Sequence, residues 1–192
     1  MKKLVFATSN QNKVREIQQM MGDAYNFQSL IDIGCHEDIP ETQPTIEGNA
    51  LQKARYVYEK YGANCFSEDT GLLIDALNGA PGVYTASYGG PQKNPEDNMN
   101  KVLKELKGVK DRNAHFKTVI ALIIDGNEYT FEGIAAGTIC HERTGSGGFG
   151  YDPVFMPEKS NKSFAQMSAR EKDSISHRGK ATAKLKEFLR SL

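Results

Sequence analysis

The sequence has no surplus of charge of either sign, because its 192 residues carry 24 Lys and Arg against 24 Asp and Glu. A protein that binds along DNA or RNA needs a basic surface that neutralises many phosphates, so this balance argues against nucleic-acid binding. One small phosphate ligand needs only a few nearby lysines. Small phosphate compounds, rather than polymers, are therefore compatible with the charge of the chain.

Long hydrophobic runs are also missing. The apolar residues 4–7 are far too few for the hydrophobic region of a signal peptide, and polar residues follow them at once. No run approaches the length of a membrane-spanning helix. Cys35, Cys65 and Cys140 include no closely spaced pair, which fits neither a disulfide framework nor a zinc site. We therefore expect a cytoplasmic protein without a membrane segment, in which the cysteines are small buried side chains.

The rest of the composition is that of an ordinary globular protein. Hydrophobic residues make up 39% and charged residues 25% of the chain, which predicts a folded core and little disorder. The length suits one domain, which we expect to span residues 1–192. Predicted strands and helices alternate along the chain, and this order indicates an α/β domain with a mixed β-sheet.

Local signals place the first elements. Short apolar runs predict strands at residues 3–7 and 25–31. Apolar residues at helical spacing predict a helix that carries Val14, Ile17 and Met21 and stops at Gly22, and a second helix over residues 45–61. The second helix has Thr45 as its cap and Gly62 as its stop.

The second half of the chain is equally well marked. Asn94 followed by Pro95 is a strong helix start. The dipeptide Asp125-Gly126 suits the tight turn of a β-hairpin, which we expect to join strands at residues 115–124 and 128–139. A last helix is expected over residues 176–192, with one inward face: Ala181, Leu185, Phe188, Leu189 and Leu192.

Two adjacent carboxylates stand out in Ser67-Glu68-Asp69-Thr70-Gly71. The stretch follows a short run that can be a strand end, so we expect the acids in a loop. Successive side chains of an extended segment point to opposite faces. One carboxylate can then bind a cation while the other orients a water, a lysine or the loop. The alternative is that both acids are only solvated.

Glu41 and Lys53 could join the same site. Glu41 lies in a loop pinned by two prolines and would be a second oxygen ligand for a hard cation, or else a solvated loop acid. Lys53 lies beside the buried stripe of the second helix. It either extends to solvent along its aliphatic stem or reaches a charged ligand.

Thr8-Ser9-Asn10 and the following Lys13 lie between the first strand and the first helix. Backbone N–H groups and the helix dipole favour an anion at such a point, so the stretch predicts a phosphate cradle. Ordinary capping with a surface lysine is the alternative. The Gly-Lys-Ser/Thr signature of a P-loop is absent.

The glycine-rich stretch at residues 145–150 matches G-x-G-x-x-G, but Tyr151-Asp152-Pro153 follows it, where a dinucleotide-binding motif would open a helix. We interpret it as a loop that presents Phe149 and Asp152. Phe149 is either a stacking platform for a base or a core residue. Further along the chain, donors for a base edge or a phosphate gather near the last helix; the alternative is a solvated polar turn. These donors are Lys172, Ser176, His177 and Arg178.

Together these motifs closely resemble the inosine triphosphate pyrophosphatase family, whose members are also called XTP/dITP diphosphatases. The matching stretches keep the family's order over nearly the whole chain, and jointly they are very specific. They are Thr8-Ser9-Asn10-Gln11-Asn12-Lys13, Glu41-Thr42, Asn49-Ala50, Lys53-Ala54, Ser67-Glu68-Asp69-Thr70-Gly71-Leu72, Gly79-Ala80-Pro81-Gly82-Val83-Tyr84-Thr85-Ala86, Gly148-Phe149-Gly150-Tyr151-Asp152-Pro153-Val154-Phe155 and Ser176-His177-Arg178-Gly179-Lys180-Ala181.

The resemblance implies hydrolysis of a purine nucleoside triphosphate to the monophosphate and pyrophosphate, with Mg²⁺ as the cofactor. It implies a preference for ITP, dITP and XTP over ATP and GTP. It also implies an elongated mixed β-sheet flanked by helices, two lobes with a central cleft, and a homodimer.

The family's functional residues fall on matching positions of this chain. Glu41 and Asp69 would bind the metal, with Asp69 also the proton acceptor, and Lys53 and Glu68 would support that site. The phosphates would be held by Thr8, Ser9, Asn10, Gln11, Asn12 and Lys13. Thr70 would touch the substrate. The residues of the base pocket would be Phe149, Gly150, Tyr151, Asp152, Lys172, His177 and Arg178, with Phe149 stacked on the purine and Asp152 at its edge.

The chain departs from the family at Gly48, where many members carry a glutamate, and this puts the number of metal ions in doubt. A milder change is Gln43-Pro44, where a glycine is common. Two other functions compete with the implied one: hydrolysis of a different modified nucleotide, and nucleotide binding without turnover. Retention of Lys13, Glu41, Lys53 and Asp69 together argues against the second.

Overall fold

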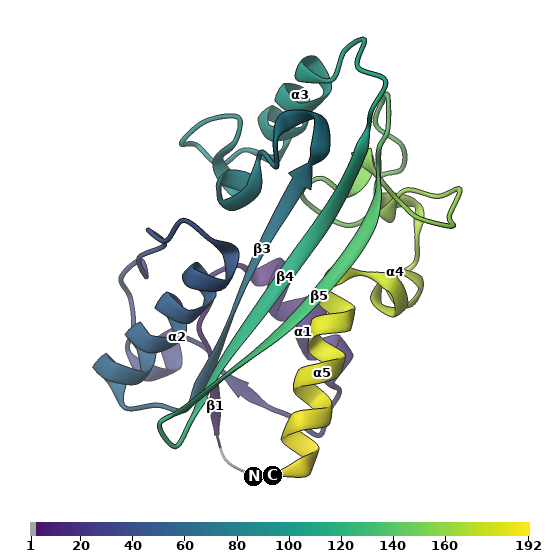
Figure 1. Cartoon of the computed structure of the whole chain (residues 1–192). Coiled ribbons are helices and arrows are strands. Elements are labelled where there is room, and N and C mark those ends of the chain that lie inside the picture. Colours follow the sequence, from purple (N-terminus) through teal and green to yellow (C-terminus); the bar gives the residue numbers. More distant parts are fainter. Residues whose placement is uncertain (1–2) are drawn as a thin grey trace. The chain divides into compact units, whose positions relative to one another are not determined.

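The structure is a computed structural model, and it describes residues 3–192. These residues form a six-stranded sheet with the strand order β2-β1-β3-β4-β5-β6 and with helices packed against it (Figure 1). The strands are β1 Leu4–Phe6, β2 Phe27–Gln28, β3 Cys65–Ile74, β4 Asn113–Ile124, β5 Asn127–Ile139 and β6 Phe155–Pro157. Strand β1 is parallel to β2 and β3, whereas β5 and β6 are antiparallel. The predicted α/β fold with a mixed sheet is confirmed.

The helices follow the local signals of the sequence closely. They are α1 Gln11–Met21, α2 Ile46–Tyr61, α3 Pro95–Glu105, α4 Ala169–Ile175 and α5 His177–Ser191. The Thr45 side chain accepts the N–H of Gly48 at the start of α2, and Gly62 ends that helix in the left-handed conformation. The Asn94 side chain accepts the N–H groups of Glu96 and Asp97 at the start of α3. No helix within residues 3–192 is long and apolar enough to cross a membrane.

The chain divides into two compact units. The first contains the residues up to Asp69, Thr118–Gly133 and Arg178–Leu192, and the second contains Thr70–Lys117 and Ile134–His177. The divisions therefore fall between Asp69 and Thr70 and between His177 and Arg178, two pairs of chain neighbours to which we assigned site roles.

In the first unit, helices lie on both faces of the strands. Ile17 and Met21 of α1 and Ala181 and Leu185 of α5 share one apolar core with strand residues such as Phe66. The neighbours of Phe66 on β3 face α2 instead, because Ser67 Oγ donates to the Ala50 carbonyl and Cys65 Sγ lies 3.2 Å from the Ala54 carbonyl oxygen. Since side chains alternate along a strand, α1 and α5 cover one face and α2 the other (Figure 1).

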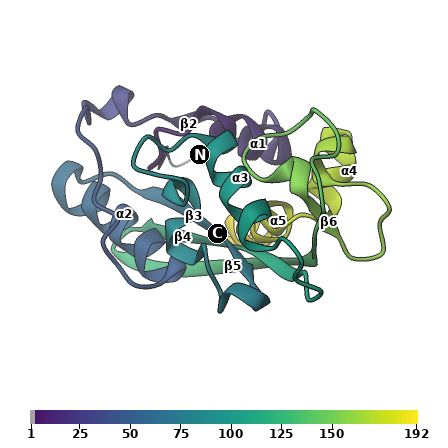
Figure 2. The ribbon, with the colours of Figure 1, turned by 90° about the horizontal axis from the view of Figure 1, so that it is seen from above.

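The second unit has a core of its own. Met99 and Val102 of α3, and Leu106 directly after it, pack there with Phe116 of β4. The same core includes the buried apolar residues Leu72, Ile74, Phe155 and Phe164. Strand β6 and helix α4 belong to this unit and lie in the same part of the view in Figure 2. Each unit thus buries its own apolar residues.

Three sequence predictions and one alternative need correction. The strand expected at residues 25–31 is only Phe27–Gln28, because the chain turns into a 3-10 helix at Ile31–Ile33. Glu68 and Asp69 lie inside β3 and not in a loop. The alternative of a solvated polar turn before the last helix is wrong, because this stretch contains the short helix α4 and its donors are buried. Leu192 was expected to face inward, but it is 69% exposed at the end of the chain.

Candidate active site

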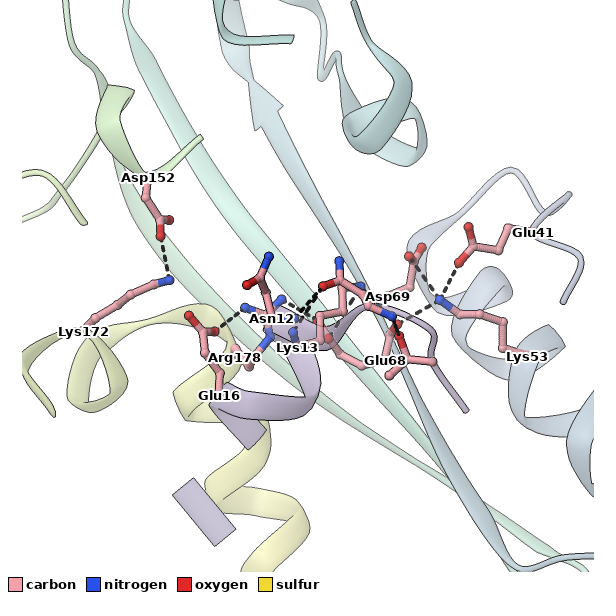
Figure 3. A network of polar contacts seen from close by, with 12 residues as sticks. Asn12, Lys13, Glu16, Glu41, Lys53, Glu68, Asp69, Asp152, Lys172 and Arg178 are labelled. Carbon is pink, nitrogen blue, oxygen red and sulfur yellow. Dashed lines mark hydrogen bonds and ion pairs between the residues drawn. The ribbon is translucent and has the colours of Figure 1, made fainter. Parts of the chain in front are cut away.

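The site in the first unit is built around two neighbours on β3 whose side chains point to opposite faces. Asp69 points to the α2 face, where Lys53 extends toward it (Figure 3). The Lys53 ammonium lies 3.6 Å from Asp69 Oδ1 and 2.5 Å from Glu41 Oε1, and it donates to the Glu68 carbonyl oxygen at 2.9 Å. One lysine therefore holds two carboxylates that are far apart in the sequence.

Lys53 does not extend to solvent, which was one of the two alternatives, because its side chain is only 8% exposed and its ammonium contacts Glu41 and Asp69. Burial alone would lower the pKa of Lys53, but the two carboxylates raise it overall. The ammonium is therefore positively charged at neutral pH.

For Asp69, burial and not the neighbouring charges determines the direction of the pKa shift. Burial raises the pKa of its carboxyl group, and the ammonium groups of Lys53 and Lys13 oppose that shift. Burial also lowers the pKa of Lys13, which Glu68 partly compensates. Carboxylates and ammonium groups therefore share a partly dehydrated place, where interactions between charges are stronger than in water.

Glu68 occupies the other face of β3 and is completely buried. Its Oε1 accepts a hydrogen bond from Arg178 Nη2 at 2.9 Å, and its Oε2 lies 3.5 Å from the Lys13 ammonium. Arg178 in turn donates from Nη1 to Glu16 Oε2 at 2.6 Å (Figure 3). The solvated-acid alternative is wrong for Glu68, because a charge network and not water surrounds it.

Arg178 itself is 2% exposed at the start of α5. Burial would lower the pKa of the guanidinium, but Glu68 and Glu16 raise it overall. Its position at a helix start is unfavourable for a cation on its own, and these two carboxylates supply the missing partners. The structure thus places Arg178 on Glu68, and its predicted contact with a base stays a prediction.

The predicted phosphate cradle lies at the start of α1. Asn10 caps this helix, because its side-chain oxygen accepts the N–H groups of Asn12 and Lys13 at 3.0 and 3.3 Å. Thr8 Oγ1 accepts the N–H of Asn10, while Ser9 and Gln11 are exposed. Lys13 is not a surface lysine: its side chain is 15% exposed, and its ammonium lies 3.4 Å from the Glu68 carbonyl oxygen. Capping and a directed lysine are therefore both present.

A divalent cation is not enclosed by protein side chains alone in residues 3–192, where no group of three or more His, Cys, Asp or Glu residues could hold a metal ion. Glu41 and Asp69 nevertheless offer hard oxygen ligands at the same ammonium group. Mg²⁺ commonly takes only one or two carboxylates together with substrate phosphates and water. The donor set fits that mode of binding.

The second unit holds the residues predicted for a base pocket except Arg178, which belongs to the first unit. Asp152 and Lys172 are 4% and 5% exposed, and the Lys172 ammonium lies 2.7 Å from Asp152 Oδ2 (Figure 3). The same oxygen accepts the backbone N–H of Phe149 at 2.9 Å. The Lys172 ammonium also lies 4.9 Å from the centre of the Phe149 ring. One buried ion pair thus fixes both the backbone and the ring face of Phe149, which is itself partly exposed.

Gly148 is required by this arrangement. Its φ angle is +68°, and a Cβ atom there would meet Asp152 Oδ2 at 2.0 Å. Any side chain at residue 148 would therefore push away the carboxylate that holds Phe149. The glycine-rich stretch allows a close approach of backbone and carboxylate, and it is followed by a three-residue 3-10 helix, Asp152–Val154, and not by an α-helix.

Two further predicted residues are buried in the second unit. The His177 ring stacks on Phe116, with ring centres 4.5 Å apart and planes inclined by 16°. Tyr151 is 5% exposed, and its hydroxyl donates to the Thr85 carbonyl oxygen at 2.7 Å. Gly150 and Thr70 are partly exposed. Tyr151 and His177 are thus buried in the second unit, and their contacts with substrate stay predictions.

Sequence reasoning missed Glu16 and the capping box of α4. Glu16 lies three residues after Lys13, which is the spacing of neighbours on a helix face, and that spacing was a usable signal. Ser168 and Glu171 cap α4 reciprocally, and the pattern Ser-x-x-Glu announces such a helix start. Phe116 carried no local signal, because only the fold brings it to His177.

Known proteins share the sequence pattern and the fold of this chain. The sequence model of the Ham1 family matches residues 4–188. A dITP/XTP pyrophosphatase of Flavobacterium johnsoniae is 56% identical over 187 residues, which cover 97% of each chain. One from Flavobacterium psychrophilum is 55% identical and covers 98% of this chain and 99% of its own. The solved structure of the Staphylococcus aureus Ham1 protein is 35% identical, with a TM-score of 0.91 and coverage of 99% of each chain.

Proposed function

Because the chain belongs to the Ham1 family, we propose that it hydrolyses the non-standard purine nucleoside triphosphates dITP, XTP and ITP to the monophosphate and pyrophosphate. The names of its relatives support dITP and XTP as substrates. The observation that carries the proposal is the contact of Lys53 with both Glu41 and Asp69. That contact brings together two acids that can bind a metal ion and an ammonium group that can bind a phosphate.

Lys13 and Lys53 provide fixed positive charge for the polyphosphate. A nucleoside triphosphate carries about four negative charges, and lysine is a common phosphate binder. Both ammonium groups are held toward β3, because each lies within reach of the Glu68 carbonyl oxygen. We assign the start of α1, residues 8–13, to the phosphates as well, since its N-terminus favours anions.

We propose Mg²⁺ as the cofactor, with Glu41 and Asp69 as its protein ligands. When bound, it supplies positive charge at the phosphates and lowers the pKa of a bound water. Asp69 orients the attacking water and accepts its proton. Lys53 keeps the carboxylates of Glu41 and Asp69 together, and Glu68 fixes the register of β3 from the opposite face.

The pocket of the second unit takes the purine. Phe149 offers a ring face for stacking, and Asp152 and Lys172 hold that ring in place. A site with hydrogen-bond donors for a 6-oxo group would leave them unpaired opposite the 6-amino group of adenine, which costs more than a misfit of shape. We assign this discrimination to donors near His177 and Arg178. We further propose that the protein acts in the cytoplasm as a homodimer, as the family resemblance implies.

A panel of nucleotides tests the proposed function. The purified chain is incubated with dITP, XTP, ITP, GTP, ATP and modified pyrimidine triphosphates, with Mg²⁺ and with EDTA, and pyrophosphate and phosphate are measured separately. We expect pyrophosphate from dITP, XTP and ITP, only with Mg²⁺, and far less from ATP and GTP. Preference for a modified pyrimidine would support the first alternative, and binding without any product would support a non-catalytic module.

A further inference from the structure

The segment that carries Glu41 has almost no apolar support. Cys35 and Ile46 are buried, but none of residues 36–45 between them is buried. Side chains of an exposed segment do not hold a carboxylate in place by packing. Polar contacts with α2 must therefore fix the position of Glu41.

The N-terminal part of this segment is attached to α2 by Glu37. A single carboxylate oxygen, Glu37 Oε1, accepts hydrogen bonds from Tyr56 and Tyr61 hydroxyl groups at 2.8 and 2.7 Å, and it also contacts the Lys60 ammonium. Hydrogen bonds from Lys60 and the two tyrosines lower the pKa of Glu37 well below its usual range. The carboxylate is therefore ionised, and three donors converge on it.

The C-terminal part of the segment is attached to the same helix through residues on successive turns of α2. The Thr42 N–H donates to Gln52 Oε1 at 2.8 Å, and Gln52 Nε2 donates back to Thr42 Oγ1 at 2.9 Å. The Gln43 N–H donates to Asn49 Oδ1 at 2.9 Å. Going along the segment, the partners move back along α2 toward its start. Glu41 and its partner Lys53 lie between the two attachments.

We propose that Glu37, through Tyr56 and Tyr61, is a positioning residue that fixes the Glu41 carboxylate at the cation site. This role rests on the proposed function, because it assigns Glu41 to the metal. Without the Glu37 attachment, the segment before Glu41 is held to α2 by fewer contacts, and the carboxylate samples positions away from Lys53. Partners that orient a metal ligand typically change metal affinity by about 10–100-fold when they are lost.

The test uses two variants that weaken the attachment by different routes: Glu37→Gln removes the charge of the acceptor, and the double variant Tyr56→Phe/Tyr61→Phe removes two of its three donors. Glu128→Gln is the matched control, because it breaks an exposed ion pair between α2 and β5, in which Glu128 accepts from Arg55 at 2.7 Å. The first readout is amide hydrogen exchange of residues 36–45 without metal or substrate. We expect faster amide exchange than in wild type at Thr42 and Gln43 in both attachment variants. In the control, the exchange rates of these amides should equal those of wild type.

The second readout is the Mg²⁺ concentration for half-maximal pyrophosphate release from dITP. We expect about a tenfold increase in both attachment variants, with kcat at saturating Mg²⁺ within about twofold of wild type. Exchange or Mg²⁺ requirement equal to the control would overturn the positioning role alone. If the wild-type chain releases no pyrophosphate with Mg²⁺, the proposed function fails. The role of Glu37 in positioning the proposed metal ligand Glu41 then fails with it.

Discussion

Glu68 and Asp69 are adjacent on β3, and their carboxylates serve different partners on opposite faces of the strand. Glu68 accepts from Arg178 at 2.9 Å, and Asp69 lies 3.6 Å from the Lys53 ammonium. A shift of the strand by one residue would exchange the two faces. The register of β3 therefore decides which acid is buried in the charge network and which one lies beside Lys53.

Removing the charge of Glu68 should destabilise the fold. Glu68→Gln removes one of the two carboxylates, Glu68 and Glu16, that pair with the buried guanidinium of Arg178. Breaking a buried ion pair on one side typically costs about 3–5 kcal/mol. Urea unfolding followed by circular dichroism measures the change in the free energy of unfolding. Glu128→Gln, in an exposed pair, should cost less than about 1 kcal/mol, and equal losses in both variants would show that Glu68 is no special support.

Gly48→Ala should destabilise the protein, although the same substitution usually stabilises a helix. Gly→Ala inside a helix usually stabilises by about 0.5–1 kcal/mol. Here a Cβ atom would lie 2.8 Å from Gln43 Cβ and 2.9 Å from Thr45 Oγ1, so Gly48→Ala should destabilise by about 1–3 kcal/mol. Adding Gln43→Gly should recover part of this loss, with a coupling of at least about 0.5 kcal/mol. Strict additivity in a double-mutant cycle would contradict the contact.

Lys172 should affect binding of the base more than the chemical step. Lys172→Met removes the ammonium that holds Asp152 and faces the Phe149 ring. We expect KM for dITP to rise by about tenfold, because a desolvated cation–π contact and a buried ion pair are both lost. Lys101→Met is the control, since Lys101 lies 4.2 Å from the Tyr88 ring outside the proposed pocket. A fall in kcat with unchanged KM would assign Lys172 to another role.

Arg178 should contribute to the choice of base. Arg178→Ala is expected to reduce turnover of ITP more than turnover of ATP, because a donor for the 6-oxo group is lost. Steady-state kinetics with both nucleotides measure the ratio. Equal losses on ITP and ATP would mean that the guanidinium serves Glu68 and the phosphates alone.

Elements with local signals could be predicted from the sequence. Thr45 and Gly62 bound α2, and Asp125-Gly126 forms the turn between β4 and β5, because caps and tight turns depend on a few neighbouring residues. The prediction of a loop at Glu68 and Asp69 was wrong, because their conformation depends on residues that are distant in the sequence. Buried acids inside a strand need partners such as Arg178 and Lys53, and those contacts follow from the fold.

The candidate site shows the same division. The sequence motifs named Lys53, and its apolar neighbours on α2 showed that it lies beside the core. Whether it would reach solvent or a carboxylate depended on the position of β3 relative to α2, which no local pattern contains. A solvated polar turn was the alternative prediction for Lys172 and His177. In the structure, Lys172 contacts buried Asp152, and His177 stacks on buried Phe116.

The most direct test of the account is pyrophosphate release from dITP by Asp69→Asn, with Asp75→Asn as the control at an exposed aspartate just after β3. The asparagine keeps the shape of residue 69 but cannot accept the proton. We predict that Asp69→Asn unfolds like wild type, still binds dITP, and loses at least about 100-fold in kcat, whereas Asp75→Asn keeps full activity. Near-normal turnover in Asp69→Asn would contradict the account.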